Sequence, residues 1–154
     1  LGVITDTFET AITWDRFEAL YDGVRERTAR AIREICGHES SISCRFTHIY
    51  PDGPAPYFSY SALGTASGKL SDSLAKWREV KHAPNELVVG LGGTVTHHHA
   101  VGRDHRSGYE TQSPVLVRSA LASAKSVFDP AGILNPGVLI DPDGRELGPR
   151  GALS

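Results

Sequence analysis

The order of polar and apolar residues along the chain predicts an α+β fold of the ferredoxin-like type, with the element order β-α-β-β-α-β. Three observations lead to this prediction: stretches of strand-like alternation, two long stretches with helical spacing, and a turn segment dense in proline and glycine. In such a fold two helices pack on one face of a four-stranded antiparallel sheet. The other face stays open. A C-terminal helix and a tail are expected to follow.

The first strand and the first helix are predicted from residue type and spacing. Residues 2–12 are rich in Val, Ile, Thr and Phe, which is typical of a strand. A helix is expected to begin after the N-cap Thr13 and to stop at Gly37. Its apolar positions recur at helical spacing: Phe17, Leu20, Tyr21, Val24, Ala31, Ile32 and Ile35. Its many arginines indicate a solvated face.

A hairpin is predicted in the middle of the chain. Residues 41–50 alternate, so that one side receives Ile42, Cys44, Phe46, His48 and Tyr50. The turn segment PDGPAP follows, and residues 57–64 predict a second strand. Phe58 and Tyr60 suit the core, which places Tyr57 and Ser59 on the open face.

The second half of the chain predicts another helix, a fourth strand and a C-terminal helix. Residues 70–91 predict a helix that is distorted or divided near Pro84, with the core positions Trp77, Val80, Leu87 and Val88. The stretch GGTVTHHH, residues 92–99, predicts the fourth strand. A polar loop is expected over residues 100–112 and a helix over 114–128, where Pro114 suits the first turn. Residues 141–154 are expected to be flexible.

Composition narrows the class of protein. The chain has 154 residues, 40% of them hydrophobic and 22% charged, which indicates ordinary globular material. A net charge of -2 gives no general attraction to nucleic acid or to an anionic membrane, and no apolar run is long enough to span a membrane. Two cysteines are too few for a disulfide framework, so we expect thiols in the cytoplasm. Because the chain starts at Leu1 and contains no methionine, we expect it to be a piece of a longer polypeptide.

Three adjacent histidines, His97, His98 and His99, are the most unusual feature of the sequence. A zinc site needs three or four ligands that converge, and no CxxC or HExxH motif supports one, so no metal is expected. Histidines that fill polar gaps at a strand end are a second interpretation. A cluster for proton transfer and anion binding is favoured, because histidine titrates near neutral pH and Arg103 and Arg106 follow closely.

The alternation of the predicted strands adds a geometric expectation. If Val95 faces the helices, His98 lies on the open face of the sheet. Arg45 and Tyr57 are expected on the same face. A guanidinium, a phenol and an imidazole would therefore converge on one surface.

Four stretches, taken together, resemble a known family. DTFETAITWDR, SCRFTHIYPDG, GGTVTHHHAVGRDH and DPAGILNPGVL occur in the order and spacing seen in the C-terminal part of FAD-linked oxidases of the vanillyl-alcohol-oxidase type. Within that group the chain is most similar to the alkyldihydroxyacetonephosphate synthases and their bacterial relatives. The resemblance extends to about Ile140. It implies that residues 1–112 are a fragment of the cap, or substrate, domain, and that residues 113–140 are the C-terminal helix and tail.

The resemblance also implies a cofactor and roles for the histidine run. FAD would be held mainly by an FAD-binding domain of the same polypeptide, and the sheet would cover the flavin ring. The family's active-site tyrosine matches Tyr57, and its histidine run matches His97, His98 and His99. Tyr57 and His98 would then be acid/base groups, while the neighbouring histidines position substrate and flavin.

Two arginines and an asparagine complete the set of expected site residues. Arg45 and Arg103 are expected to contact an anionic substrate. Asn135 is expected to bind the cofactor together with His98 and His99.

Three functions remain open at this point. A synthase-like enzyme would form an ether bond through a flavin adduct, with a fatty alcohol replacing a fatty acid. An FAD-linked oxidase or dehydrogenase would oxidise a small hydroxy acid or alcohol. A stand-alone ferredoxin-like binding or metal-sensing module is the third. In either enzyme the fragment alone is expected to be inactive, and the sequence leaves open whether the protein forms a homo-oligomer.

Overall fold

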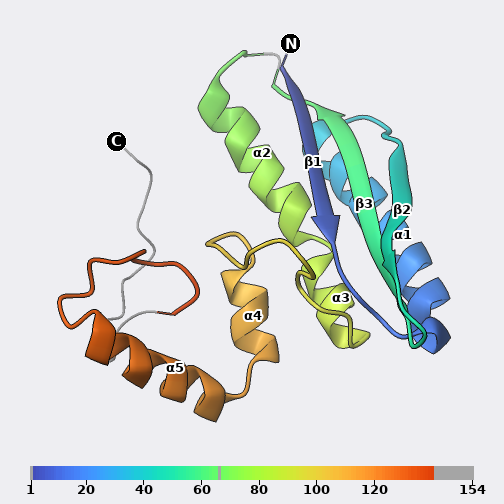
Figure 1. Ribbon diagram of the computed structural model, residues 1–154. Coiled ribbons are helices and arrows are strands. Elements are labelled where there is room, and N and C mark those ends of the chain that lie inside the picture. Colours follow the sequence, from blue (N-terminus) through green and yellow to red (C-terminus); the bar gives the residue numbers. More distant parts are fainter. Residues whose placement is uncertain (1, 66, 141–154) are drawn as a thin grey trace. The chain divides into compact units, whose positions relative to one another are not determined.

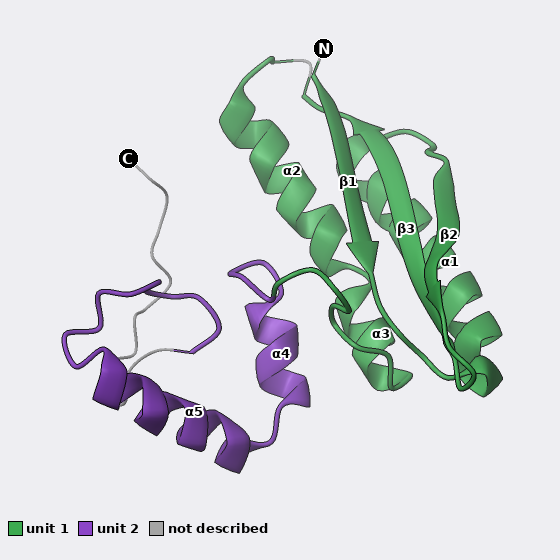
Figure 2. Ribbon diagram, viewed as in Figure 1, with its two compact units in different colours: residues 1–100 green, residues 101–154 purple. Residues whose placement is uncertain are grey.

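A computed structural model describes residues 2–65 and 67–140, and these residues form two compact units (Figure 2). The first unit comprises residues 1–100 and the second residues 101–154. The first contains a sheet and helices, and the described part of the second contains helices and turns (Figure 1). The predicted α+β class is confirmed.

The described residues of the first unit form three strands and three helices. Their order along the chain is β1 (Val3–Glu9), α1 (Trp14–Cys36), β2 (Ile42–Ile49), β3 (Pro54–Leu63), α2 (Leu70–His82) and α3 (Asn85–Gly90). The strands form an antiparallel sheet in the order β1-β3-β2 (Figure 1). The helix predicted over residues 70–91 is divided at Pro84, as expected, because proline cannot donate to the preceding turn.

The sheet has one face that packs on the helices and one that does not. Phe58 and Tyr60 are 0% and 2% exposed and belong to a core cluster with apolar residues of all three helices. Residues that pair across antiparallel strands point to the same face. Tyr57 pairs with Glu9 on one side and with Arg45 on the other, so these three residues share the open face.

A buried ion pair joins α2 to β1. Asp6 Oδ2 accepts hydrogen bonds from Trp77 Nε1 at 2.6 Å and from Lys81 Nζ at 2.7 Å. Both charged side chains are largely withdrawn from solvent. The contact fixes the position of α2 along the edge strand of the sheet.

The structure differs from the sequence-based expectations in three places. Residues 92–99 are a loop, so the described sheet has three strands and the fourth strand of the ferredoxin-like order is not formed. β3 begins at Pro54, which makes the hairpin loop shorter than expected. The predicted polar loop over residues 100–112 contains a short helix, α4 (Arg106–Gln112).

The second unit contains α4 and α5 (Val115–Phe128), followed by turns up to residue 140. The predicted C-terminal helix is present, and Pro114 is its N-cap, one residue before the first helical residue. Asp129 holds the turn after this helix: its Oδ1 accepts the backbone N–H of Ile133 at 2.9 Å and its Oδ2 accepts that of Leu134 at 3.0 Å. The expected domain boundary after residue 112 stays a prediction, and the expected flexible end lies outside the described residues.

Two further expectations concern the thiols and the membrane. Cys36 and Cys44 are both free and partly buried, and burial raises the pKa of the Cys44 thiol to about 11. Neither thiol is therefore activated as a nucleophile. Within the described ranges, no helix combines the length and the apolar character needed to cross a membrane.

Candidate functional site

Two glycines bring the histidine segment up to the end of β1. Gly92 has a φ of 83°, which favours glycine, and a Cβ at Gly93 would lie 3.0 Å from side-chain atoms of Leu20 and Thr10. Thr94 then donates its backbone N–H to Ala11 O at 3.1 Å and accepts the N–H of Ala11 on Oγ1 at 2.9 Å. These bonds place the next residues against Glu9.

Glu9 is the centre of the site. Its side chain is fully buried, although it is charged. Oε1 accepts the backbone N–H groups of three successive residues: His97 at 3.0 Å, His99 at 2.7 Å, and His98 between them. Successive backbone N–H groups that converge in this way form a concave anion site, here filled by the chain's own carboxylate.

This convergence explains why residues 97–99 are not a strand. In a strand, successive N–H groups point in opposite directions. Three of them can reach one oxygen only if the backbone turns. The turn also removes the predicted alternation, so that all three imidazoles lie near aromatic or imidazole rings of the open face.

The second oxygen of Glu9 faces two imidazoles. Oε2 lies 2.5 Å from Nδ1 of His98 and 3.7 Å from Nδ1 of His97, yet it accepts no hydrogen bond of good geometry from the described residues. Burial by itself would raise the pKa of Glu9. The three backbone donors and the neighbouring His98 outweigh burial and hold that pKa below its ordinary value.

Tyr57 connects the imidazoles to the sheet. Its ring centre lies 6.5 Å from that of His98, nearly parallel to it, and 5.7 Å from that of His99. The Arg45 guanidinium lies over the Tyr57 ring, with Cζ 4.7 Å from the ring centre. The predicted convergence of Arg45, Tyr57 and His98 is therefore present in the structure.

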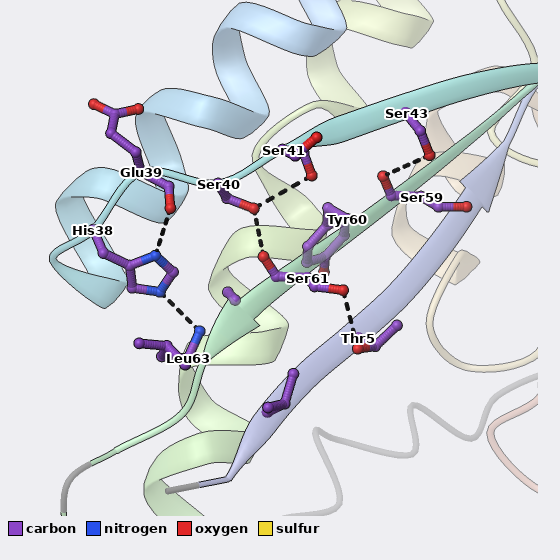
Figure 3. Close-up of a pocket in the computed structure, with 12 residues that line it drawn as sticks. Thr5, His38, Glu39, Ser40, Ser41, Ser43, Ser59, Tyr60, Ser61 and Leu63 are labelled. Atoms are coloured by element: carbon purple, nitrogen blue, oxygen red, sulfur yellow. Dashed lines mark hydrogen bonds between the residues drawn. The ribbon is translucent and has the colours of Figure 1, made fainter.

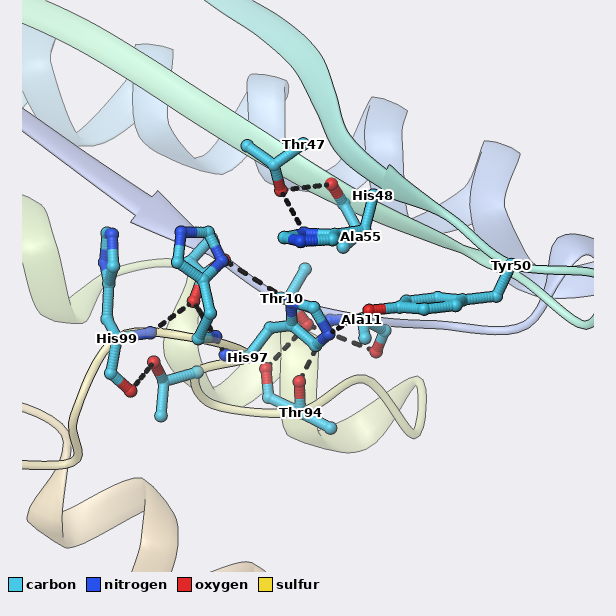
Figure 4. Close-up of polar contacts among 12 residues, drawn as sticks. Thr10, Ala11, Thr47, His48, Tyr50, Ala55, Thr94, His97 and His99 are labelled. Atoms are coloured by element: carbon cyan, nitrogen blue, oxygen red, sulfur yellow. Dashed lines mark hydrogen bonds and ion pairs between the residues drawn. The ribbon is translucent and has the colours of Figure 1, made fainter.

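A β-bulge adds a fourth imidazole that was expected elsewhere. The β2–β3 register shifts between Phe46 and His48, so His48 pairs with Ala55 and points to the open face, not to the helix side. The His48 ring then lies 5.0 Å from His97 and 5.3 Å from His98. Figure 4 shows His48 above His97, with the Tyr50 hydroxyl directed at the His97 ring; that oxygen is 3.1 Å from Nε2.

Within the described part of the chain, two sets of three side chains have ligand atoms close enough to consider a metal ion. These sets are His48, His97 and His98, and Glu9, His98 and His99. Two ligands of one zinc ion lie about 3.3 Å apart in tetrahedral geometry. The 2.5 Å between Glu9 and His98 is shorter, so these two groups contact each other directly. The expectation that no metal is bound stays a prediction.

A hollow lies farther along the open face, where serine and threonine hydroxyls line it together with apolar side chains. It has a volume of about 560 Å³ and is bounded by the β2–β3 end of the sheet and the segment before β2. Figure 3 shows the serine side chains around it, with hydrogen bonds from Ser40 to Ser61 and between Thr5 and Ser61. The side chains that follow Tyr57 on this face of β3 are Ser59 and Ser61. The surface beside the candidate site thus combines hydroxyl groups with the exposed apolar side chains of Val3 and Leu63.

Arg103 and Asn135 belong to the second unit. Arg103 Nη2 donates to Pro136 O at 2.9 Å, and Asn135 adopts a φ of 45° in the same turn. Their expected contacts with substrate and cofactor stay predictions.

Sequence reasoning missed Glu9, His48 and Tyr50 as parts of the site. Glu9 stands in a strand-like stretch at a position that alternation assigns to the open face, which is a usable signal. Its contact with residues 88 to 90 positions later in the chain has no local signal. The β-bulge that turns His48 to the open face cannot be predicted from the sequence, because residues 41–50 alternate without interruption.

Comparison with known proteins shows the family of this chain. The family described as FAD linked oxidases, C-terminal domain, matches residues 1–139. The chain belongs to this family. The expected resemblance is confirmed, and FAD is the cofactor of the enzymes of which such domains form a part.

Individual relatives include a synthase and oxidoreductases. The chain is 29% identical to the alkyldihydroxyacetonephosphate synthase of Caenorhabditis elegans, over 91% of the chain and 23% of the relative. It is 29% identical to the FAD-linked oxidoreductase YgcU of Escherichia coli (strain K12), over 86% of the chain and 27% of the relative. A solved alkyldihydroxyacetonephosphate synthase shares the fold with a TM-score of 0.58 at 18% identity, over 87% of this chain and 20% of that one. The chain thus spans about a quarter of the length of these relatives.

The residues present fit a flavin that lies against the open face of this FAD-linked oxidase domain. The helices of the first unit pack on the opposite face. The open face offers flat rings from Tyr57, His98 and His99, and the His98 side chain is 41% exposed. These rings would contact the flavin and the substrate, while other parts of the enzyme hold the rest of FAD.

Proposed function

We propose that this chain is the substrate-facing domain of an FAD-dependent enzyme that resembles the alkyldihydroxyacetonephosphate synthases in its proton-transfer groups. The observation that carries the proposal is the convergence of Arg45, Tyr57 and His98 on the open face of the sheet. The likeness to the Caenorhabditis elegans synthase supports the same reaction class. The proposed product is an ether bond, formed when an alcohol replaces a carboxylic acid on a ketose phosphate.

Each of the three groups has a distinct part in this reaction. Arg45 attracts the phosphate of the substrate, because a guanidinium binds oxyanions with charge-assisted hydrogen bonds. His98 takes the proton from the substrate carbon or from the incoming alcohol. The Tyr57 hydroxyl donates to the substrate oxygen that gains charge. Bound FAD supplies an electron-accepting ring, and the cap-like sheet excludes water from it.

A second function is supported by the hollow on the open face. Its serine and threonine hydroxyls can donate hydrogen bonds to a short polar substrate and accept them from it. The likeness to YgcU supports the same alternative. In this case the enzyme oxidises a small hydroxy acid or alcohol, and His98 takes the hydroxyl proton.

One experiment separates the two functions. The complete polypeptide that contains this chain is loaded with FAD and mixed with an acylated dihydroxyacetone phosphate or, separately, with a series of 2-hydroxy acids. The synthase proposal expects exchange of the acyl group for a fatty alcohol without net consumption of an electron acceptor. Flavin bleaching by a hydroxy acid, with continued turnover when an acceptor is added, would reject the synthase and support the oxidoreductase.

A control tests whether residues of this domain take part in the reaction. The double variant Arg45→Ala/His98→Ala should retain FAD and lose turnover with either substrate. Undiminished turnover would place the chemistry outside this chain.

A further inference from the structure

We propose that Glu9 is a positioning residue for His98. Its buried carboxylate fixes the ring of His98 and keeps a proton on Nδ1, so that Nε2 is the basic nitrogen presented to the substrate. The catalytic part of this inference rests on the proposed function. The pairing of carboxylate and imidazole does not, and it can be tested separately.

The side chain of Glu9 is held in place by its contacts. Its Oε1 accepts three backbone N–H groups, from residues 97, 98 and 99. Its side chain has no exposed surface, and its backbone belongs to the end of β1. The position of the second oxygen is therefore fixed by the sheet and by the turn together.

The second carboxylate oxygen of Glu9 needs a hydrogen-bond donor. Oε2 is buried and accepts no well-formed hydrogen bond from the described residues. A buried carboxylate oxygen without a donor destabilises a protein. The nearest candidate donor is Nδ1 of His98 at 2.5 Å, and a small rotation of the ring directs its N–H at the oxygen. The corresponding atom of His97 is farther away, at 3.7 Å, and the other nitrogen of that ring lies 3.1 Å from the Tyr50 hydroxyl.

In a neutral imidazole, the position of the proton determines which nitrogen is basic. A neutral ring with its proton on Nδ1 carries its lone pair on Nε2. No protein partner occupies Nε2 of His98 among the described residues. The ring is stacked beside Tyr57 and is partly exposed on the open face. A carboxylate that sets the tautomer of a catalytic histidine is an established arrangement in serine hydrolases, and here an unrelated fold has the same parts.

The variant Glu9→Gln separates positioning from a purely structural role. A glutamine oxygen accepts the three backbone N–H groups as a carboxylate does, so the turn is retained. The amide nitrogen in the place of Oε2 donates a hydrogen bond, which requires the lone pair on Nδ1 and moves the His98 proton to Nε2. A structural role predicts a small effect of this variant, whereas positioning predicts a large one.

The test uses the complete FAD-loaded polypeptide, with Glu26→Gln on the exposed surface of α1 as the matched control. Nitrogen-15 spectra of histidine-labelled protein, with His98 assigned through His98→Ala, should show the wild-type proton on Nδ1 and the Glu9→Gln proton on Nε2. With whichever substrate the wild type turns over, Glu9→Gln should lower kcat on the order of 10² to 10⁴-fold, with KM changed less than about threefold. Glu9→Gln/His98→Ala should be no slower than His98→Ala alone.

Three outcomes overturn the inference: a wild-type proton on Nε2 of His98, a Glu9→Gln variant with wild-type kcat, or additive losses in the double variant. The wild-type spectrum needs no variant, so it decides the pairing even if Glu9→Gln does not fold. If the wild type turns over none of the substrates while its proton is on Nδ1, the proposed function fails and the pairing stands.

Discussion

The Cζ atom of Arg45 lies 4.7 Å from the centre of the Tyr57 ring, on the open face of the sheet. This contact holds a cation beside the candidate proton-transfer groups. We expect Arg45→Ala to raise KM for an anionic substrate about 10 to 100-fold, with a smaller effect on kcat, because a charge-assisted hydrogen bond is lost. Steady-state kinetics of the complete polypeptide measure both.

A matched control exists on the helix side. Arg25 has the same relation to Tyr21, at 5.1 Å. Arg25→Ala should leave KM unchanged. Equal effects of the two variants would show that Arg45 does not meet the substrate.

Tyr57→Phe should lower kcat on the order of 10² to 10⁴-fold, because the ring stays and the hydroxyl proton is lost. The hydroxyl now donates to Thr7 Oγ1 at 3.0 Å, so unfolding free energy should fall by only about 1 kcal/mol. Rapid-mixing kinetics measure the change in rate, and urea unfolding measures the change in unfolding free energy. Tyr21→Phe is the control, and a wild-type rate in Tyr57→Phe would remove Tyr57 from the proton-transfer groups.

The ion pair between Asp6 and Lys81 predicts a strongly non-additive effect on stability. Asp6→Ala leaves the Lys81 ammonium largely buried without its partner and should cost about 3 to 5 kcal/mol. Adding Lys81→Met should recover most of that loss, since no buried charge remains. Urea unfolding at neutral pH tests this, and a double variant as unstable as Asp6→Ala would contradict it.

The lowered pKa of Glu9 predicts a specific loss of stability in acid. A carboxyl group whose pKa is lower in the folded than in the unfolded chain stabilises the fold above the unfolded value and loses this contribution as pH falls through the folded value. The window therefore lies below about pH 4.5, the ordinary value of Glu9. The difference in unfolding free energy between wild type and Glu9→Gln should be largest at neutral pH and shrink below that point. If this difference in unfolding free energy stays constant down to pH 3, the contacts of Glu9 do not lower its pKa in the folded chain.

Asp129→Ala should loosen the turn that follows α5. The carboxylate accepts the N–H groups of Ile133 and Leu134 and a hydrogen bond from Lys125, which is the main cause of its lowered pKa. We expect faster amide hydrogen exchange at Ile133 and Leu134, with exchange in β3 unchanged. Asp104→Ala at an exposed position is the control, and unchanged exchange in Asp129→Ala would refute the role of the side chain.

Local patterns predicted most of the fold. The apolar spacing of α1, the alternation of β3 and the break at Pro84 are properties of short stretches, and the structure confirms them. The fourth strand was wrong for a non-local reason: residues 97–99 turn around a carboxylate that lies nearly ninety positions earlier. The same applies to His48, which a shift in the pairing of two strands turns to the open face.

The sequence by itself determined the family, the cofactor class and the placement of Tyr57 and Arg45 on one face, because motif order and strand alternation depend on neighbouring residues. His98 lies near the same face through a turn and not through the predicted strand. Only the tertiary structure decided that Glu9 is the group around which the imidazoles are arranged. A buried carboxylate is stable only where donors surround it, and the donors of Glu9 come from a distant turn. Its role therefore depends on the folded chain, and no short stretch of sequence records it.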